Sequence, residues 1–474
     1  MPSRRDGVKS DLWRYPGTLA MFRCTVWLAL CGGLASSIGA VGASEPRPEQ
    51  DALWQPASPR DELKPKFGRG IGPRGYTSLT IEHDGREGLD GYWKQAFPVA
   101  GGTWYRFHCV RKAENVAVPR RSSLVRIVWT DDKGNKVRRD APPGNGYAPQ
   151  SAGNAEAEHP QDGPIDKAGW CEVAGVFQAP KAATNALVEL HLQWAPCGKV
   201  SYSEVEFAET TAPPPRKVRL AAIHYLPKPS KTPAEVCEQF APLIAEAAQQ
   251  KADLVVLGET ITYAGMRGSN YEDVAEPIPG PSTDYFAALA KQHKLHIVVG
   301  LYERAEHLIY NVAVLLGPDG KLIGKYRKVA LPRDEFAAGV APGSDYPVFD
   351  TQIGKIGLMV CYDGFFPEVA RQLSNNGAEI IAWPVWGCNP LLAQARACEN
   401  HVYVVSSTYG NSTANWMRTA VYDHEGKALV AAEDFGTVVT AEVDLAKPLN
   451  WNSLGDFKAE LPRHRPVWSK HGDE

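Results

Sequence analysis

The amino-acid sequence predicts an all-β domain of jelly-roll type followed by a larger α/β domain. Residues 75–207 contain short alternating segments rich in Val, Trp, Tyr and Phe and no long segment of helical period, which is typical of a β-sandwich. Residues 218–408 alternate apolar strands with helical patterns, which is typical of an α/β layered fold. Between them, the proline-rich stretch TTAPPPRK at residues 210–217 has the composition of a linker.

The composition is that of an ordinary folded protein. The 474 residues are 44% hydrophobic and 22% charged, which allows two or three domains. The formal net charge of −3 and the lack of a basic run argue against a nucleic-acid partner. The sequence has no Walker loop, no GxGxxG after a strand and no paired Cys/His metal spacing, so we expect neither cofactor nor metal.

The N-terminal residues 1–43 are predicted to be a signal peptide. Arg14 and Arg23 precede an apolar stretch, CTVWLALCGGLA at residues 24–35, and small residues then lead to a cleavage site at Ala43. The apolar stretch is too short for an ordinary transmembrane helix. We therefore expect export to the periplasm or the cell exterior, with a retained membrane anchor as the alternative.

The cysteine count fits an exported protein with a free thiol. Nine cysteines occur, and Cys24 and Cys31 would leave with the signal peptide. The odd number that remains leaves at least one thiol unpaired. A disulfide among Cys109, Cys171 and Cys197 stays open.

The β-domain is expected over residues 71–209, after a Pro- and charge-rich linker at residues 44–70. A long stretch without periodicity, residues 140–168, predicts one surface loop. The predicted strands are 77–83, 103–110, 123–130, 169–178, 186–194 and 199–207.

The second domain, with a C-terminal extension, is expected over residues 218–474. Thr232 begins a capping-box pattern that predicts a helix. A hairpin over residues 310–327, with Pro-Asp-Gly at its turn, makes the predicted sheet mixed. The other predicted strands are 218–225, 253–259, 295–302, 354–360, 378–384 and 401–408, and the other helices are 282–294, a helix after Pro367, and 390–400.

Four residues at the ends of core elements are candidates for chemistry. Cys361 ends a buried strand in GLMVCYDGFFPEVARQL, Glu259 ends DLVVLGE, and Lys328 and Glu335 lie in KYRKVALPRDE. A lone cysteine in an apolar run usually serves only packing. A thiol nucleophile with a carboxylate base and an ammonium to stabilise developing negative charge is instead typical of covalent catalysis.

Residues from about 217 to 450 resemble the nitrilase, or carbon–nitrogen hydrolase, superfamily. The similar stretches are VVLGET, GKYRKVALPRDE, CYDGFFPE, NNGAEIIAWPVW and ARACENHVYVV, in this order. The resemblance implies an αββα-sandwich with a Glu259-Lys328-Cys361 triad, and a second glutamate, Glu335, hydrogen-bonded near the lysine. It also implies hydrolysis without metal or organic cofactor, and a homo-oligomer, dimer or larger.

The expected function is hydrolysis of a non-peptide carbon–nitrogen bond, as an amidase that releases ammonia or an amine. Glu259 would take the thiol proton, and Lys328 with the backbone N–H of Tyr362 would stabilise the negative charge. Nitrilase and N-carbamoyl amide hydrolase activities stay open, so the small-molecule substrate is an amide or a nitrile. Tyr362, Trp383 and Trp386 are candidates for the pocket wall, with core packing as the alternative for the tryptophans.

A function of another class is glycan binding by the N-terminal β-domain, which would bring a glycan or another polymer as a partner. The intact Glu-Lys-Glu-Cys set argues against a second domain that is only a scaffold. It does not argue against a glycan site on the first domain. The alternative for that domain is that it packs against the catalytic domain or shapes its cleft.

Overall fold

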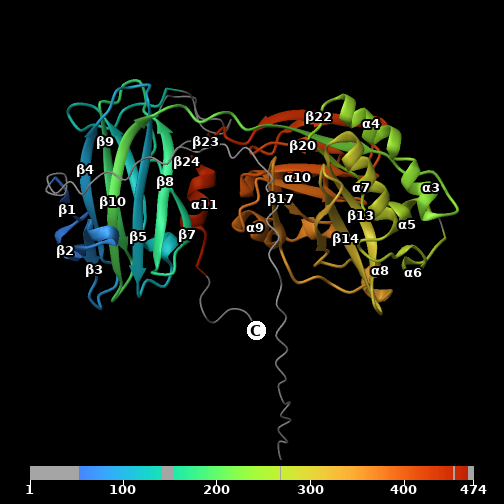
Figure 1. Cartoon of the computed structure of the whole chain (residues 1–474), viewed down its shortest axis with the longest axis horizontal. Coiled ribbons are helices and arrows are strands. Elements are labelled where there is room, and N and C mark those ends of the chain that lie inside the picture. The colour runs from blue at the N-terminus through green and yellow to red at the C-terminus, as the bar shows by residue number, and fades with distance from the viewer. Residues whose placement is uncertain (1–52, 141–152, 267, 452–453, 468–474) are drawn as a thin grey trace, which may run out of the picture. The chain divides into compact units, whose positions relative to one another are not determined.

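The computed structural model describes residues 53–140, 153–266, 268–451 and 454–467 (Figure 1). The predicted signal peptide, residues 1–43, lies outside these residues and stays a prediction. An antiparallel β region comes first in the chain and an α/β region follows it. Each is described by itself.

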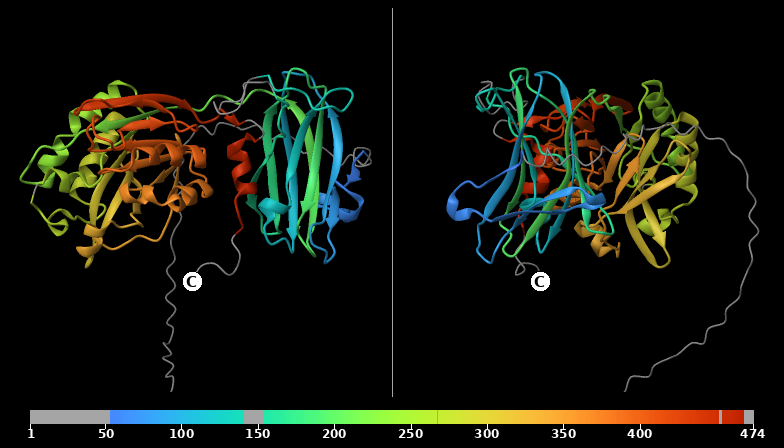
Figure 2. Two further views of the ribbon diagram at one scale, coloured as in Figure 1. Left: turned by 180° about the vertical axis from the view of Figure 1, so that it is seen from behind. Right: turned by 60° about the vertical axis from the view of Figure 1, so that its left-hand side comes forward.

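In its described residues, the first region has ten strands, which form two sheets. Figure 2 shows these sheets from two further sides. The strands are β1 (Gln55–Ala57), β2 (Lys66–Ile71), β3 (Thr77–Glu82), β4 (Asp90–Pro98), β5 (Trp104–Glu114), β6 (Val125–Thr130), β7 (Gln161–Ile165), β8 (Trp170–Gln178), β9 (Asn185–Gln193) and β10 (Lys199–Thr210), with short helical turns η1 (Asp61–Leu63), η2 (Pro73–Gly75) and α2 (Pro119–Ser122). A four-stranded sheet has the order β1-β4-β9-β6 and a six-stranded sheet the order β2-β3-β10-β5-β8-β7. Neighbouring strands are antiparallel throughout.

One apolar core serves both of these sheets. Trp129 of the four-stranded sheet and Phe107 and Tyr202 of the six-stranded sheet are fully buried in it. The six predicted strands correspond to β3, β5, β6, β8, β9 and β10 and are confirmed. The sequence missed β4 because its inward positions are Gly91, Trp93 and Gln95, only one of which is large and apolar.

The expected linker at residues 44–70 is corrected in its described part. β1 pairs with β4 and β2 pairs with β3, so both belong to the sheets. Trp54 is 5% exposed, and the rings of Phe67 and Trp93 pack edge to face at 5.3 Å. This Pro- and charge-rich segment therefore packs against the core through its few apolar side chains. The expected loop at 140–168 likewise contains β7, an edge strand whose residues are all exposed and so show no apolar alternation.

The second region begins after residues 211–216, which form neither helix nor strand. Its first sheet has six strands, β11 (Lys217–His224), β12 (Leu254–Val256), β13 (His296–Ala305), β14 (Leu308–Leu316), β15 (Leu322–Arg327) and β22 (Thr437–Asp444), in the order β15-β14-β13-β12-β11-β22. The pairs β11–β12 and β12–β13 are parallel and the others antiparallel. The prediction of a mixed sheet is therefore confirmed.

The second sheet of this region is also six-stranded. Its strands are β16 (Val348–Thr351), β17 (Gly354–Leu358), β18 (Ile380–Pro384), β19 (Tyr403–Ser407), β20 (Ala420–Tyr422) and β21 (Ala428–Ala431), paired in chain order. Side chains such as Leu220 and Val298 of the first sheet and Ile356 and Val404 of the second share one fully buried core. The two sheets therefore pack against each other.

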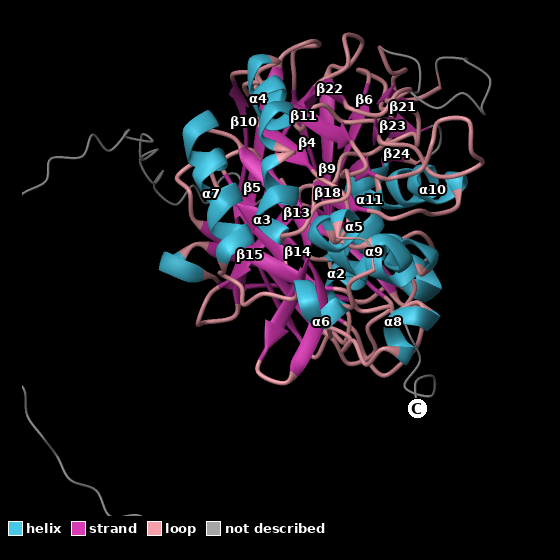
Figure 3. Cartoon of the chain, turned by 90° about the vertical axis from the view of Figure 1, so that its right-hand side faces the viewer, coloured by secondary structure: helices cyan, strands magenta, loops and turns pink. Residues whose placement is uncertain are grey.

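Helices cover the outer face of each sheet (Figure 3). On the first sheet lie α3 (Pro233–Glu238), α4 (Ala241–Gln249) and α7 (Pro281–His293). Apolar side chains from this layer, among them Phe240 and Phe286, pack on the sheet and form a second core. On the second sheet lie α9 (Pro367–Asn375) and α10 (Pro390–Asn400). Shorter helices are α5 (Ile261–Gly265), α6 (Tyr271–Val274), α8 (Arg333–Ala337) and the 3₁₀ helix η3 (Cys361–Phe365). The layers are helix, sheet, sheet and helix, the αββα arrangement that the resemblance implied.

Local sequence signals explain where the helices begin. The side chain of Thr232 accepts a hydrogen bond from the backbone N–H of Glu235 at 3.2 Å, which confirms the predicted cap. The helical pattern that follows divides into α3 and α4 because Pro242 has no N–H to continue the first helix and suits the start of a new one.

The C-terminal extension contains β23 (Asn450–Trp451), β24 (Gly455–Asp456) and α11 (Phe457–His464). Arg463 of α11 donates a hydrogen bond to the carbonyl of Pro160 at 2.8 Å, and Glu460 pairs with His159 at 3.0 Å. The extension therefore contacts the loop that precedes β7.

Two further observations concern the sequence predictions. Cys109, Cys171 and Cys197 are free, so the disulfide that the sequence left open does not form among these residues. In the part of the chain that the structure describes, no helix is both long and apolar enough to cross a membrane.

Candidate active site

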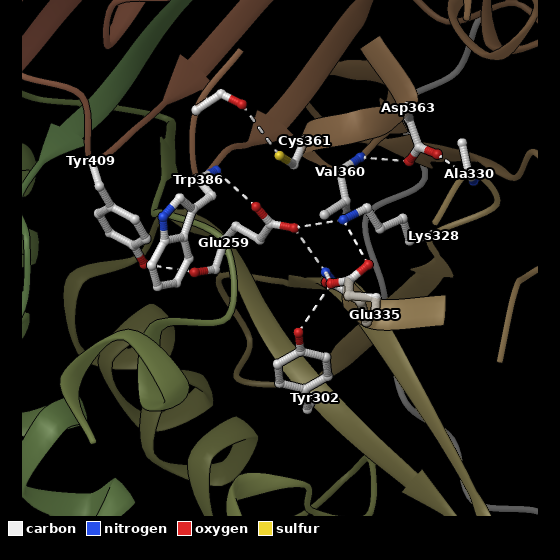
Figure 4. Close-up of polar contacts among 12 residues, drawn as sticks. Glu259, Tyr302, Lys328, Ala330, Glu335, Val360, Cys361, Asp363, Trp386 and Tyr409 are labelled. Carbon is white, nitrogen blue, oxygen red and sulfur yellow. Dashed lines mark hydrogen bonds and ion pairs between the residues drawn. The ribbon is translucent and has the colours of Figure 1, made fainter. Parts of the chain in front are cut away.

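The four candidate residues lie around one cavity of about 1030 Å³ (Figure 4). Glu259 follows β12, and Lys328 follows β15. Glu335 lies in α8, and Cys361 is the first residue of η3, just beyond β17. The structure thus brings together side chains that are up to about a hundred residues apart in sequence, three of which follow core strands while Glu335 lies within a short helix.

Lys328 forms ion pairs with both glutamates. Its Nζ lies 2.9 Å from Glu259 Oε1 and 2.9 Å from Glu335 Oε2, and the lysine is 1% exposed. Burial lowers the pKa of Lys328, but the carboxylates of Glu259 and Glu335 outweigh it and the net pKa is raised. The lysine is therefore a fixed positive charge in the cavity wall.

Cys361 sits in a strained turn. Its φ is 38°, in the left-handed region that residues with a Cβ seldom adopt. The thiol contacts the carbonyl oxygen of Gly387 at 3.5 Å. Burial, and then the charge of Glu259, raise the pKa of this thiol well above its usual value, with Lys328 acting in the opposite direction. At rest the thiol is therefore protonated, and it needs a base to become a nucleophile.

One backbone segment holds Glu259 and Cys361 at the same place. The N–H of Trp386 donates to Glu259 Oε2 at 2.7 Å, and the next residue, Gly387, accepts from the thiol. The hydroxyl of Tyr409 donates to the backbone oxygen of Glu259 at 2.6 Å. Glu259 is thus held at its main chain and at its carboxylate.

Asn311 is a site residue that the sequence reasoning missed. Its Nδ2 donates to Glu259 Oε1 at 2.8 Å and to Glu335 Oε1 at 2.6 Å, and the side chain is 1% exposed. Tyr302 also donates to Glu335 Oε1, at 3.0 Å. A signal was present, because Asn311 is the polar residue in the otherwise apolar run of β14, and a buried polar group needs a partner.

Asp363 was missed too, although it follows the cysteine closely. Its carboxylate accepts from the N–H of Val360 and of Ala330 at 2.9 Å each, and from the hydroxyl of Tyr326 at 2.8 Å. Burial raises the pKa of Asp363 to about 6. The side chain ties the strand end before Cys361 to the segment after Lys328.

The predicted pocket residues divide into two groups. Tyr362 and Trp386 line the cavity. Trp383 does not: it is 0% exposed in β18, inside the core between the sheets, so its assignment to the pocket was wrong. Its ring lies under the nucleophile turn, where a Cβ added to Gly364 would come within 1.9 Å of it. The role of the Tyr362 N–H stays a prediction.

Across the described residues, no group of three or more His, Cys, Asp or Glu side chains is arranged to hold a metal ion. Glu259 and Glu335 are instead both paired with Lys328. The arrangement can therefore supply a nucleophile, a base and a fixed cation from protein side chains.

Comparison with known proteins assigns the family. The family model described as carbon-nitrogen hydrolase matches residues 219–452. An omega-amidase of Xenopus laevis, NIT2-B, is 30% identical over 273 residues, which cover 52% of this chain and 94% of that protein. The chain belongs to the carbon–nitrogen hydrolase family. The predicted resemblance is confirmed, and this hydrolase is an enzyme that acts on carbon–nitrogen bonds.

Other relatives of the hydrolase carry similar names. A nitrilase of Pyrococcus abyssi is 40% identical over 177 residues, covering 35% of this chain and 65% of that protein. A crystal structure of Saccharomyces cerevisiae Nit3, a member of branch 10 of the nitrilase superfamily, matches with 27% identity and a TM-score of 0.43, over 48% of this chain and 90% of that chain.

Proposed function

We propose that this hydrolase cleaves a non-peptide amide through a thioester on Cys361, with Glu259 as general acid–base and Lys328 as the fixed cation. The observation that supports it most directly is the buried cluster in which Lys328 pairs with two glutamates beside a cysteine on a strained turn. Such positioned groups around one cavity are what acyl transfer requires.

The first half of the reaction forms the thioester. Because the thiol is protonated at rest, Glu259 takes its proton as the sulfur attacks the amide carbon. The carbonyl oxygen becomes negative, and the ammonium of Lys328 with the N–H of Tyr362 would stabilise it. When the tetrahedral intermediate collapses, the carbon–nitrogen bond breaks, and Glu259 returns the proton to the departing ammonia or amine.

The second half hydrolyses the thioester. Glu259 takes a proton from water, whose oxygen attacks the acyl carbon, and then gives the proton to the departing sulfur. The products are a carboxylic acid and the regenerated thiol. Glu335 holds Lys328 in place and Asn311 holds the two carboxylates, so both act by positioning.

The test is the removal of the sulfur. Cys361→Ala and Cys361→Ser should lose more than about 99% of ammonia release from amides while the unfolding temperature changes little, because both changes are small. Mass spectrometry of quenched wild-type enzyme should show a substrate-dependent acyl adduct on the peptide with Cys361. Cys398→Ala is the matched control, since Cys398 does not line the cavity. Retained turnover in either Cys361 variant, or an adduct on another cysteine, would contradict the proposal.

Nitrile hydrolysis is a second candidate, supported by the 40% identity with the Pyrococcus abyssi nitrilase. The same thiol can attack a nitrile carbon, and the developing negative charge then lies on nitrogen. Comparing kcat/KM for an amide and the nitrile with the same carbon skeleton decides between the two. N-carbamoyl compounds belong in the same comparison.

Glycan binding by the β region is a separate proposal. Export of the chain and assembly into a homo-oligomer are further proposals that do not depend on it. The glycan site is supported by Trp194, which is 49% exposed, adopts φ 54° and lines a cavity of about 170 Å³. The guanidinium of Arg121 lies 5.0 Å from the centre of the indole. An exposed aromatic ring in a strained loop is a candidate stacking surface for a sugar. Glycan-array binding that Trp194→Ala leaves unchanged would contradict the proposal.

A further inference from the structure

The charges around the active-site cavity indicate which substrates it accepts. Four side chains that line it are ionisable acids or bases with a formal charge at neutral pH: Glu259, Lys328, Asp334 and Glu335. The charge of Lys328 is already paired, because its Nζ lies 2.9 Å from a carboxylate oxygen of each of two glutamates. Among the lining residues in the described part of the chain there is no other lysine, arginine or histidine.

In the part of the cavity wall that the structure describes, a substrate carboxylate would therefore meet no unpaired cation. It would instead face Asp334, an exposed carboxylate in α8. Burying an anion without a partner is strongly unfavourable, and a like charge nearby adds to the penalty. A cationic group would meet attraction at the same place.

The cavity wall is largely aromatic. Tyr271 lies between Tyr263 and Tyr302, with ring centres 4.9 Å and 4.8 Å away, and Trp386 lies 6.1 Å from Tyr263. Trp386 and Trp416 line the cavity although they are 44% and 50% exposed. Exposed rings beside a continuous aromatic wall favour a flat apolar group, and their faces also attract cations.

The size of the cavity is consistent with a substrate of this kind. Its volume of about 1030 Å³ is at the upper end of what pockets for drug-sized ligands enclose. A short aliphatic amide would leave most of the aromatic wall in contact with water. Only a substrate with a larger acyl or amine group would contact most of these aromatic rings.

We propose that the hydrolase prefers amides that carry an aromatic group and no carboxylate, and that it prefers a cationic to an anionic substituent on that group. This inference rests on the proposed amidase function of the same site. Beyond that function, it specifies the charge and the shape of the preferred substrate.

The experiment compares three 3-phenylpropionamides that differ only in the para substituent: carboxylate, methyl and aminomethyl. Ammonia release at neutral pH gives kcat/KM for each. We expect the aminomethyl and methyl compounds to exceed the carboxylate by at least about tenfold, which corresponds to ~1.4 kcal/mol. Added salt should reduce the difference between the charged compounds, because it screens their interaction with Asp334.

Asp334→Asn tests the electrostatic part. The ratio of kcat/KM for the aminomethyl and carboxylate compounds should fall at least threefold. Asp350→Asn is the matched control, since this side chain is 82% exposed and does not line the cavity, and it should leave the ratio unchanged. An unchanged ratio in Asp334→Asn, or a ratio that falls equally in the control, would overturn the role of Asp334.

The two proposals fail in different ways. A carboxylate compound that is hydrolysed as well as the methyl compound overturns the substrate preference alone, as does ammonia release from butyramide without release from any phenylpropionamide. No ammonia from any of the four amides, together with no acyl adduct on Cys361, overturns the proposed function.

Discussion

Replacing Asn311 by leucine tests whether the buried amide positions the glutamates. The change keeps the branched shape and the number of side-chain heavy atoms and removes the hydrogen bonds from Nδ2 to Glu259 and Glu335, at 2.8 Å and 2.6 Å. A hydrogen bond to a charged group contributes about 1.5–3 kcal/mol. Both carboxylates keep Lys328, so we expect the loss of about one such bond in total. The free energy of unfolding should fall by about 2–3 kcal/mol.

The same loss should appear in catalysis. If the loss of about 2–3 kcal/mol acts on the transition state, kcat falls by about 30- to 160-fold, because 1.36 kcal/mol is tenfold in rate. The assay is ammonia release at saturating amide, with urea unfolding measured on the same samples. A double-mutant cycle of Asn311→Leu with Glu335→Gln should show less than additive losses of kcat, because both changes loosen the same cluster.

Asn400→Leu is the matched control for burying a hydrophobic group in place of an amide. Asn400 is 0% exposed, donates to the Arg396 carbonyl at 2.9 Å and does not line the cavity. It should lose stability and keep kcat. The reasoning is refuted if Asn311→Leu retains kcat within threefold of wild type, or if the two variants lose kcat equally.

Two further predictions concern stability. Gly364→Ala should lower the free energy of unfolding by about 1–3 kcal/mol and reduce kcat, because the new Cβ would lie 1.9 Å from the Trp383 ring under the nucleophile turn. Gly85→Ala is the matched control and should change neither quantity much, because neither glycine has a positive φ and the nearest atom to a Cβ on Gly85 lies 4.0 Å away. Burial lowers the pKa of His401 to about 4, so the unfolded chain binds a proton that the native state does not, and stability should fall as the pH drops from about 6.5 towards 4. In His401→Phe, the slope of the free energy of unfolding against pH, measured by urea unfolding over this range, should decrease by the equivalent of about one proton. The control His307→Gln, at an exposed position, should keep the wild-type slope. An equal slope in His401→Phe and wild type would contradict the prediction.

Most of the fold could be predicted from local patterns. The strands from β3 to β19 that alternate or form apolar runs were found, and so were the main helices and the spacer before β11. Of the strands that were missed, β1, β2 and β7 lack an apolar alternation of their own, whereas β20, β21 and β22 contain apolar residues and were missed all the same. β1 and β2 take part in the sheets because Trp54 and Phe67 pack on residues far along the chain. Such pairings depend on tertiary contacts that no local window contains.

The site was predicted where a residue type and an element end coincide. Glu259, Lys328 and Cys361 were candidates because each follows a core strand or the hairpin, and Glu335 received its role from the resemblance to the nitrilase superfamily. Asn311 could not be assigned a role, because its partners are set by the pairing of β14 with its neighbours.

Trp383 and Trp386 could not be told apart from the sequence. They lie three residues apart around Pro384, and one is in the core while the other faces the cavity. β18 lies between parallel neighbours and is buried on both faces, so its residues show no alternation that would mark an outward position.

The backbone at the site adds an argument that side chains alone do not supply. Thr260, directly after Glu259, has φ 40°, and Cys361 has φ 38°. Left-handed conformations of such residues cost about 1–3 kcal/mol each and persist only where the surroundings enforce them. A Cβ on Gly300 would lie 2.6 Å from the Cα of Glu259, so a glycine on β13 lets the first turn pack this closely.

The second turn packs through Gly364 on Trp383 in the same manner. The two strained residues coincide with the points where the proposed base and nucleophile leave their strands. Ordinary strand endings would direct these two side chains elsewhere. The strain, and the two glycines that permit it, are therefore best explained by the need to aim Glu259 and Cys361 into one cavity rather than by the packing of the core.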